Sequence, residues 1–175
     1  MGDEPSKMTR LVIRKATYDD IPSIVEVNLS STTNDETLGF TTQEWATFSS
    51  PDKLMKLWVE DNRLKDGCEV IVAEKDGRLI GYIVFKRERD HVYIDDIDIA
   101  KDQQRMGVGR ALVTHVENIA VVSGYSLITT DTTENAQGIP WKSYGFWIKM
   151  GYRDTGERLP TKWDFKTIPF TKNLK

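Results

Sequence analysis

The sequence predicts a mixed α/β sheet in a single domain, and three observations lead to this class. A chain of 175 residues is of ordinary size for one domain. Runs of β-branched and aromatic residues alternate with segments in which apolar residues recur at helical spacing. Two strand-like runs are separated by Lys75-Asp76-Gly77-Arg78, whose Asp-Gly pair is a strong signal for a β-hairpin.

The elements expected before the hairpin are one strand and two helical regions. Residues 10–16 form the strand. The first helix follows Asp19 and Asp20, because acidic residues favour the positive end of a helix and Ile21, Ile24, Val25 and Leu29 have its spacing. The second helical region has a capping-box pattern at Thr41 and Glu44, a start signal at Ser50-Pro51 and a stop at Gly67.

The remaining expected elements alternate in the same way. The hairpin strands are residues 70–74 and 79–85, and a charged turn at 86–91 leads to a strand over 92–99. A helix begins near Gly107 and Gly109 and ends near Gly124. It is followed by a strand at 126–130, a helix at 140–150 and strands at 152–155 and 162–170.

The composition argues against several classes of protein. Lysine and arginine number 24 and aspartate and glutamate 27, so the net charge of −3 disfavours nucleic-acid binding. No apolar run approaches the roughly 20 residues of a membrane span, so we expect no membrane partner. A single cysteine, Cys68, fits a reducing compartment and buried packing, and His91 and His115 are too far apart to suggest a metal site. We expect no metal and a cytoplasmic protein.

The domain boundaries expected from the sequence are simple. Residues 1–8 have no apolar core of a signal peptide and are expected to form a flexible N-terminal tail. Residues 9–175 are expected to form one domain.

The strand at 92–99 carries carboxylates that need an explanation. Strict alternation would divide it into one face with Asp95, Ile97 and Ile99 and another with Ile94, Asp96 and Asp98. Burying an unpaired carboxylate costs several kcal/mol. Two interpretations stay open: a strand end that meets solvent or forms ion pairs with Arg105 and Arg110, or an acid that faces a substrate.

The loop after this strand has the composition of a phosphate-binding turn. Gly107 and Gly109 would let backbone N–H groups approach a ligand, and the helix that starts there adds a partial positive charge. A tight strand-to-helix turn is the alternative. The Walker pattern is absent, and only two of the three glycines of a dinucleotide-binding fingerprint are present. These features favour a nucleotide-bearing ligand other than ATP or NAD.

At these residues the sequence resembles the GNAT superfamily of acetyl-CoA-dependent N-acetyltransferases. Gln104, Gly107 and Gly109 match its Gln/Arg-x-x-Gly-x-Gly/Ala motif. Asn135-Ala136 and the stretch 146–152 look like its second conserved region. The resemblance covers about residues 10–170 and implies a mixed, mostly antiparallel central sheet with helices on both faces.

The resemblance also implies which residues hold the cosubstrate, acetyl-CoA. Main-chain groups of the loop would bind its pyrophosphate, the strand before the loop would pair with the pantetheine arm, and an asparagine would contact the arm. The implied residues are Ile97, Asp98, Ile99, Gln104, Arg105, Met106, Gly107, Val108, Gly109, Arg110 and Asn135. A turn residue flanking the last helix is the alternative interpretation of Asn135.

The sequence departs from the family at the acid that protonates the leaving thiolate. Trp147 occupies the position of the tyrosine that many members use, and an indole N–H cannot serve as that acid. Tyr144, one helical turn earlier, is a candidate replacement. Packing in the core is its structural alternative, and water is the alternative donor.

Acetyl transfer to an amine also needs a base, because an alkylammonium ion is not a nucleophile. Asp95 is the first candidate and Asp131, at the end of the next strand, is the second. The sequence therefore predicts an N-acetyltransferase that works by direct attack in a ternary complex. Its expected partner is an amine acceptor, either a small molecule or a protein or peptide, and we expect a monomer or homodimer. A catalytically silent acyl-CoA-binding module and a scaffold that keeps only the fold stay open as alternatives.

Overall fold

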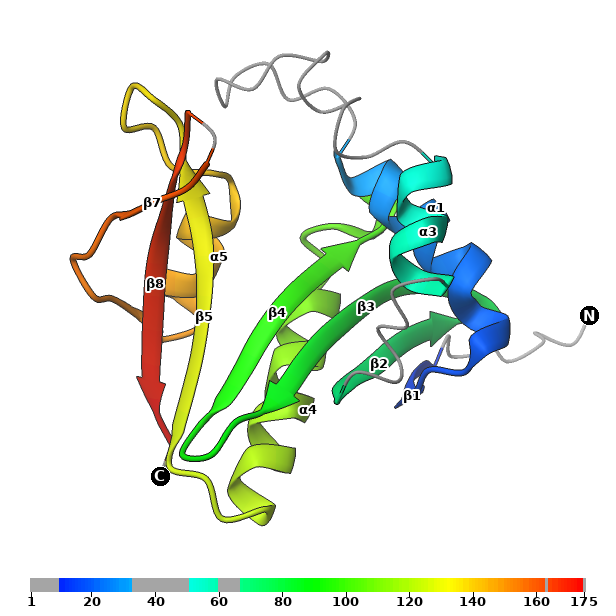
Figure 1. Ribbon diagram of the computed structural model, residues 1–175. Helices are drawn as coiled ribbons and strands as arrows, with labels where there is room; N and C mark the ends of the chain where they lie inside the picture. Colours follow the sequence, from blue (N-terminus) through cyan, green and yellow to red (C-terminus); the bar gives the residue numbers. More distant parts are fainter. Residues whose placement is uncertain (1–9, 33–50, 60–66, 163, 175) are drawn as a thin grey trace, which may run out of the picture.

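The computed structural model describes residues 10–32, 51–59, 67–162 and 164–174 (Figure 1). The strands are β1 (Leu11–Lys15), β2 (Cys68–Lys75), β3 (Arg78–Arg87), β4 (Val92–Ile99), β5 (Leu127–Glu134), β6 (Arg153–Asp154), β7 (Leu159–Pro160) and β8 (Lys166–Asn173). The helices are α1 (Ile21–Thr32), α3 (Pro51–Val59), α4 (Val108–Val122) and α5 (Ser143–Lys149), with short 3-10 turns η1 (Tyr18–Asp20) and η3 (Lys101–Gln103).

The strands form one mixed sheet. Their order is β1-β2-β3-β4-β5-β8-β6, and β7 pairs with β8. Every neighbouring pair is antiparallel except β4 and β5, which run parallel. Helices α1 and α3 lie on one face of the sheet and α4 and α5 on the other (Figure 1). The predicted fold class, a mostly antiparallel sheet with helices on both faces, is confirmed.

The turn between β2 and β3 shows why the Asp-Gly signal was informative. Asp76 and Gly77 both have positive φ, 53° and 75°, as the tight turns of two-residue hairpins require. Lys75 then faces Arg78 across the hairpin.

Two hydrophobic cores fix the layers. The core on the α1 side joins that helix to β2 and β3 through residues such as Ile24, Val72 and Val84, and Cys68 is buried in it, as expected. The core on the α4 side is larger and includes Leu112 and Trp147. Both faces of the central strands are therefore buried, which is why β2 and β3 read as nearly continuous apolar runs.

The C-terminal elements differ from expectation in their bounds. Strand β5 continues to Glu134, four residues beyond the predicted end, because it pairs along its length with β8. Helix α5 begins at Ser143 rather than at Pro140, which instead forms a β-bridge with Glu134 and so has an extended backbone. The two-residue strand β7 was not predicted.

Two expectations from the sequence fall outside the described residues. These are the N-terminal tail, residues 1–8, and the capping box at Thr41 and Glu44. Within the described part of the chain, no helix is both long enough and apolar enough to cross a membrane.

Candidate active site

The two parallel strands in the middle of the sheet separate shortly after they meet. β4 and β5 pair through only three positions, Val92 with Ile128, Tyr93 with Thr129 and Ile94 with Thr130, and then diverge (Figure 1). Beyond this point β4 stays paired with β3, and β5 stays paired with β8. In the described chain, no strand pairs with residues 95–99 on the β5 side. An extended ligand can hydrogen-bond to such an edge as an added strand would.

A β-bulge lies where the strands separate. Val84 of β3 faces Asp96, and the next residue, Phe85, faces Ile94, so Asp95 is the extra residue of β4. A bulge of this kind leaves one residue outside the ladder and bends the strand that carries it. The bulge directly follows the last pair between β4 and β5.

The bulge also changes which side chains share a face of β4. Ile97 and Ile99 pack against the α4-side core, which also contains Ile94. The expectation that alternation places these two isoleucines opposite Ile94 is therefore wrong. The physical reason is the single inserted residue, Asp95, which shifts the two-residue period of everything that follows it.

Asp96 and Asp98 lie on the α1 side, in a hydrogen-bonded cluster. Asn28 donates to Oδ2 of Asp98 at 2.6 Å, and Ser31 donates to Oδ1 at 2.6 Å. The Tyr82 hydroxyl lies 3.0 Å from Oδ2 of Asp96 and 3.0 Å from Oδ2 of Asp98, and its single proton serves one of them at a time. Burial, followed by the charge of Asp96, raises the pKa of Asp98 to about 7.

Asp98 therefore fits neither interpretation of the strand acids, which were an acid that meets solvent or pairs with loop arginines and an acid that faces a substrate. It is half-buried, and the partners described above come from α1 and β3 rather than from the loop arginines. Asn28, Ser31 and Tyr82 were not identified from the sequence. The only available signal was that Asn28 and Ser31 are polar residues three positions apart on an otherwise apolar helix face.

The two candidate bases lie where the strands separate. Asp95 and Asp131 directly follow the last paired residues, Ile94 on β4 and Thr130 on β5. Tyr93 donates a hydrogen bond to Oδ2 of Asp131 at 2.6 Å, which lowers the pKa of that carboxyl group. Burial, the largest cause, and the charge of Asp95 outweigh that bond and raise the pKa of Asp131 above its ordinary value. A carboxylate with a raised pKa is a stronger proton acceptor than an ordinary one.

The loop between β4 and α4 presents backbone donors. Arg105 and Gly107 both have positive φ, 64° and 84°, in a turn where left-handed residues can aim successive N–H groups at one point. Gly107 is the N-cap of α4, and no side chain caps the helix there. The side chain of Gln104 donates to the carbonyl of Ile99 at 3.1 Å and so ties the loop to β4. This arrangement can hold an anion at the helix start.

Gly109 is required by close packing instead. A Cβ atom there would lie 3.3 Å from Cε2 of Phe146, on α5, and 3.7 Å from a side-chain carbon of Ile99. The first turn of α4 therefore approaches both β4 and α5. Among the other predicted loop residues, Arg105, Met106 and Arg110 are exposed.

Asn135 is buried at the end of β5 and shapes a turn. Its side-chain oxygen accepts hydrogen bonds from the backbone N–H groups of Gln137, at 3.0 Å, and Ile139, at 2.9 Å. This is the turn role that was its alternative interpretation, and the expected contact with a cofactor arm stays a prediction.

Trp147 is a core residue. Its side chain is 2% exposed, and its ring makes edge contacts with Phe146 and Tyr152 at centroid distances of 5.0 Å. The substitution at this position therefore replaces a polar side chain of the family with a packing group.

Tyr144, the candidate replacement, is hydrogen-bonded at the far edge of the sheet. Its hydroxyl donates to Oδ2 of Asp154 on β6 at 3.0 Å, and this bond raises the pKa of the phenol. Arg158 lies beside the same carboxylate and, as the largest cause, lowers the pKa of Asp154 to about 2. In this arrangement the proton of Tyr144 points toward an ionised acceptor and not toward β4.

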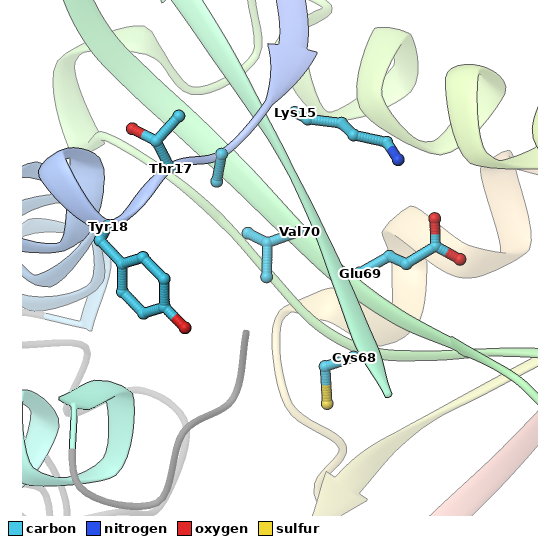
Figure 2. A pocket seen from close by; sticks show the side chains of 7 residues that line it. Lys15, Thr17, Tyr18, Cys68, Glu69 and Val70 are labelled. Carbon is cyan, nitrogen blue, oxygen red and sulfur yellow. The ribbon is translucent and has the colours of Figure 1, made fainter. Parts of the chain in front are cut away.

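A cavity of about 290 Å³ lies elsewhere, beside β1 and the start of β2 (Figure 2). Its lining residues are Lys15, Ala16, Thr17, Tyr18, Cys68, Glu69 and Val70. Strand β3 separates β2 from β4 in the sheet, so this cavity contains none of the predicted site residues.

Comparisons with known proteins agree with this geometry. The model of the acetyltransferase (GNAT) family matches residues 34–146. A Desulfovibrio desulfuricans protein described as a GNAT-family acetyltransferase has a similar structure, with a TM-score of 0.70 and 18% identity over 95% of this chain and 100% of that one.

Two further similar structures were solved with coenzyme A. The PaiA N-acetyltransferase of Thermoplasma acidophilum has a TM-score of 0.66 and 18% identity over 91% of this chain and 98% of its own. An aminoglycoside 6'-N-acetyltransferase has a TM-score of 0.67 and 14% identity over 94% and 97%. Identities this low show a shared fold. Because the family model covers more than half of the sequence, the chain belongs to the acetyltransferase (GNAT) family.

Proposed function

We propose that this protein transfers the acetyl group of acetyl-CoA to a primary amine by direct attack in a ternary complex. One observation carries the proposal: the gap between β4 and β5 has a carboxylate on each strand at its closed end. The loop that starts α4, with its backbone donors, follows directly from the β4 side of the same gap.

Acetyl-CoA fits this gap by its chemistry. The free edge of β4 would pair with the amides of the pantetheine arm at residues 97–99, and the loop at 104–110 would hold the pyrophosphate. The two coenzyme A complexes of proteins with the same fold support acetyl-CoA as the cosubstrate. The thioester would then lie near Asp95 and Asp131.

The acids at the closed end would remove a proton from the acceptor. An ammonium group gives its proton to Asp131 or Asp95, directly or through water, and the neutral nitrogen attacks the thioester carbon. A C–N bond forms, the attacking nitrogen releases its second proton to water, the C–S bond breaks and coenzyme A leaves as a thiolate. The backbone N–H of Ile97 would stabilise charge on the carbonyl oxygen, a contribution of roughly 3 kcal/mol for one donor.

The thiolate needs little help to leave, because the intrinsic pKa of a thiol is near 8.5. Water or Tyr144 would supply the final proton. The geometry favours water, because the Tyr144 hydroxyl would first have to release Asp154. Catalysis can therefore tolerate Trp147 at the family's tyrosine position.

An assay of free thiol released from acetyl-CoA, across a panel of amines, peptides and aminoglycosides, tests the proposal. Thiol release that depends on an amine supports acetyl transfer. Binding of acetyl-CoA without thiol release from any acceptor would contradict it and support the silent acyl-CoA-binding module, which the buried Trp147 makes the second candidate. Absence of binding would leave only the fold in common with the family.

A further inference from the structure

A closed ring of strand segments and hydrogen bonds borders the gap between β4 and β5. From the pair of Ile94 and Thr130, one side runs along β4 to Asp98 and the other along β5 to Thr133. At the first end, Oδ1 of Asp98 accepts a hydrogen bond from Ser31 of α1 at 2.6 Å. The ring thus continues from the sheet into the last turn of that helix.

Lys142, just before α5, closes the ring. Its Nζ donates to the backbone carbonyl of Ser31 at 2.6 Å, although the two residues are 111 positions apart. The preceding residue, Trp141, donates its backbone N–H to the carbonyl of Thr133 at 2.7 Å. The lysine therefore connects the α1 side of β4 to the end of β5, across strands that no longer pair.

The position of this lysine has a physical basis. Ser31 is the next-to-last residue of α1, where carbonyl groups have no partner within the helix and carry the negative end of its dipole. Ser31 is only 3% exposed, whereas Lys142 is an exposed residue, so the lysine reaches the buried end of α1 from the surface. The ammonium also lies 5.6 Å from the centroid of the Trp141 ring, within range of a cation–π interaction.

The bridge lies on the side from which an acceptor would approach. Helix α1 covers the face opposite α4 (Figure 1), whereas the proposed pyrophosphate loop starts α4. With acetyl-CoA on the α4 side, the described residues leave access to the thioester through the ring. At about 3.3 Å per residue its strand sides measure roughly 13 Å along β4 and 10 Å along β5 before side chains narrow it.

We propose that the Lys142–Ser31 bridge selects the acceptor, admitting a primary amine at the end of an unbranched alkyl chain and hindering amines carried on a ring. This inference rests on the proposed function. The inference goes beyond the proposed function because Lys142 touches neither the thioester nor the base. Lys142 sets the width of the entrance by holding α1 to the end of β5.

Kinetics with two amines test the selection. Lys142→Met removes the hydrogen-bond donor, and Lys142→Arg keeps a donor at this position. Lys149→Met, at the exposed end of α5, is the matched control for the loss of a lysine. In Lys142→Met, the ratio of kcat/KM for cyclohexylamine to kcat/KM for n-butylamine should rise at least tenfold, with unchanged acetyl-CoA affinity by calorimetry. The two control variants should keep the wild-type ratio. A wild-type ratio in Lys142→Met would overturn the inference.

A measurement of access keeps the inference testable if no amine is acetylated. Asp131→Cys places a thiol at the closed end of the gap, and the natural Cys68 is buried. We compare the rates at which this thiol is labelled by a ring-bearing methanethiosulfonate and by an unbranched alkyl methanethiosulfonate. We expect Lys142→Met to raise the ratio of the first rate to the second at least tenfold. An unchanged ratio would refute the entrance role. Altered access without any thiol release from acetyl-CoA would refute the proposed function alone.

Discussion

Replacing Asp98 with asparagine should remove a pH-dependent loss of stability. Burial and the charge of Asp96 raise the pKa of Asp98 from 3.8 to about 7. The folded protein therefore binds this proton more tightly than the unfolded chain does. Its contribution makes the free energy of unfolding fall as the pH rises from about 4 to about 7 and level off above that range. The shift corresponds to about 4 kcal/mol over the whole range.

Urea denaturation of the wild type and Asp98→Asn between about pH 5 and pH 8 measures this contribution. Asparagine keeps the size of the side chain and one of the two oxygens that accept hydrogen bonds from Asn28 and Ser31, and it does not titrate. The loss of the other acceptor lowers stability equally at every pH. Relative to the wild type, the variant should gain up to about 2.7 kcal/mol in the free energy of unfolding between pH 5 and pH 8, because the rest of the shift lies below pH 5.

Asp20 and Asp154 titrate below this window, and Asp102 and Asp131 can be tested in parallel. The pKa values of Asp20 and Asp154, lowered to about 2 mainly by hydrogen bonds from arginines, mean that their stabilising contribution is lost only in more acidic solution. Asp102→Asn, at an exposed residue whose pKa Arg78 lowers, is the matched control and should show no gain. Asp131→Asn measures the contribution of a second carboxyl group whose pKa is raised. A constant difference between Asp98→Asn and the wild type would show that Asp98 is ionised throughout and refute the reasoning.

Three further predictions concern the proposed chemistry. Gly107→Val should weaken acetyl-CoA binding at least tenfold in calorimetry. No atom lies within 4 Å of a Cβ at this position, but a φ of 84° strains a branched residue by about 1–2 kcal/mol. Unchanged affinity in a folded variant would exclude the loop as the pyrophosphate site. Asp131→Asn should lower kcat about 10²-fold and remove the rise of kcat/KM with pH, since the base acts only when ionised. If Asp95→Asn has this effect instead, Asp95 is the base. Tyr144→Phe should leave turnover within threefold of wild type, because the Tyr144 hydroxyl is hydrogen-bonded to Asp154. A loss of about 10²-fold in the thiol-release assay would show that the tyrosine protonates the leaving thiolate.

Sequence reasoning succeeded where the determining chemistry is local. The bounds of β4 were predicted residue for residue, and the Asp-Gly turn fixed the β2–β3 hairpin. The start of α4 at Gly107 was predicted from two glycines and the helical period that follows them. In each case the side chains that decide the structure are neighbours in the sequence.

The bulge at Asp95 could not be predicted in this way. The alternation is interrupted, because Asp95 and Asp96 put Ile94 and Ile97 three positions apart, but the same interruption fits a regular strand with carboxylates on both faces. Only the pairing with β3 shows that the period shifts. For the same reason the faces assigned to Ile97 and Ile99 were inverted.

The cluster around Asp98 and the bridge at Lys142 were also beyond sequence reasoning. Their partners on α1 lie 67 to 111 positions away along the chain. Such contacts depend on how α1 packs over the sheet, and that packing is set by apolar residues that carry no information about the polar ones beside them.

The three-residue seam between β4 and β5 has a consequence for how the protein responds to its ligand. Strands β5, β8 and β6 are joined to the rest of the sheet by that short parallel pairing and by the α4-side core. A pantetheine arm lying along β4 would act as a removable strand, completing a sheet that the polypeptide leaves unfinished. Occupancy at 100 times the dissociation constant would add about 2.7 kcal/mol to the free energy of unfolding. We expect that gain to appear chiefly as slower amide exchange along residues 97–99, where no strand of the described residues pairs on the β5 side.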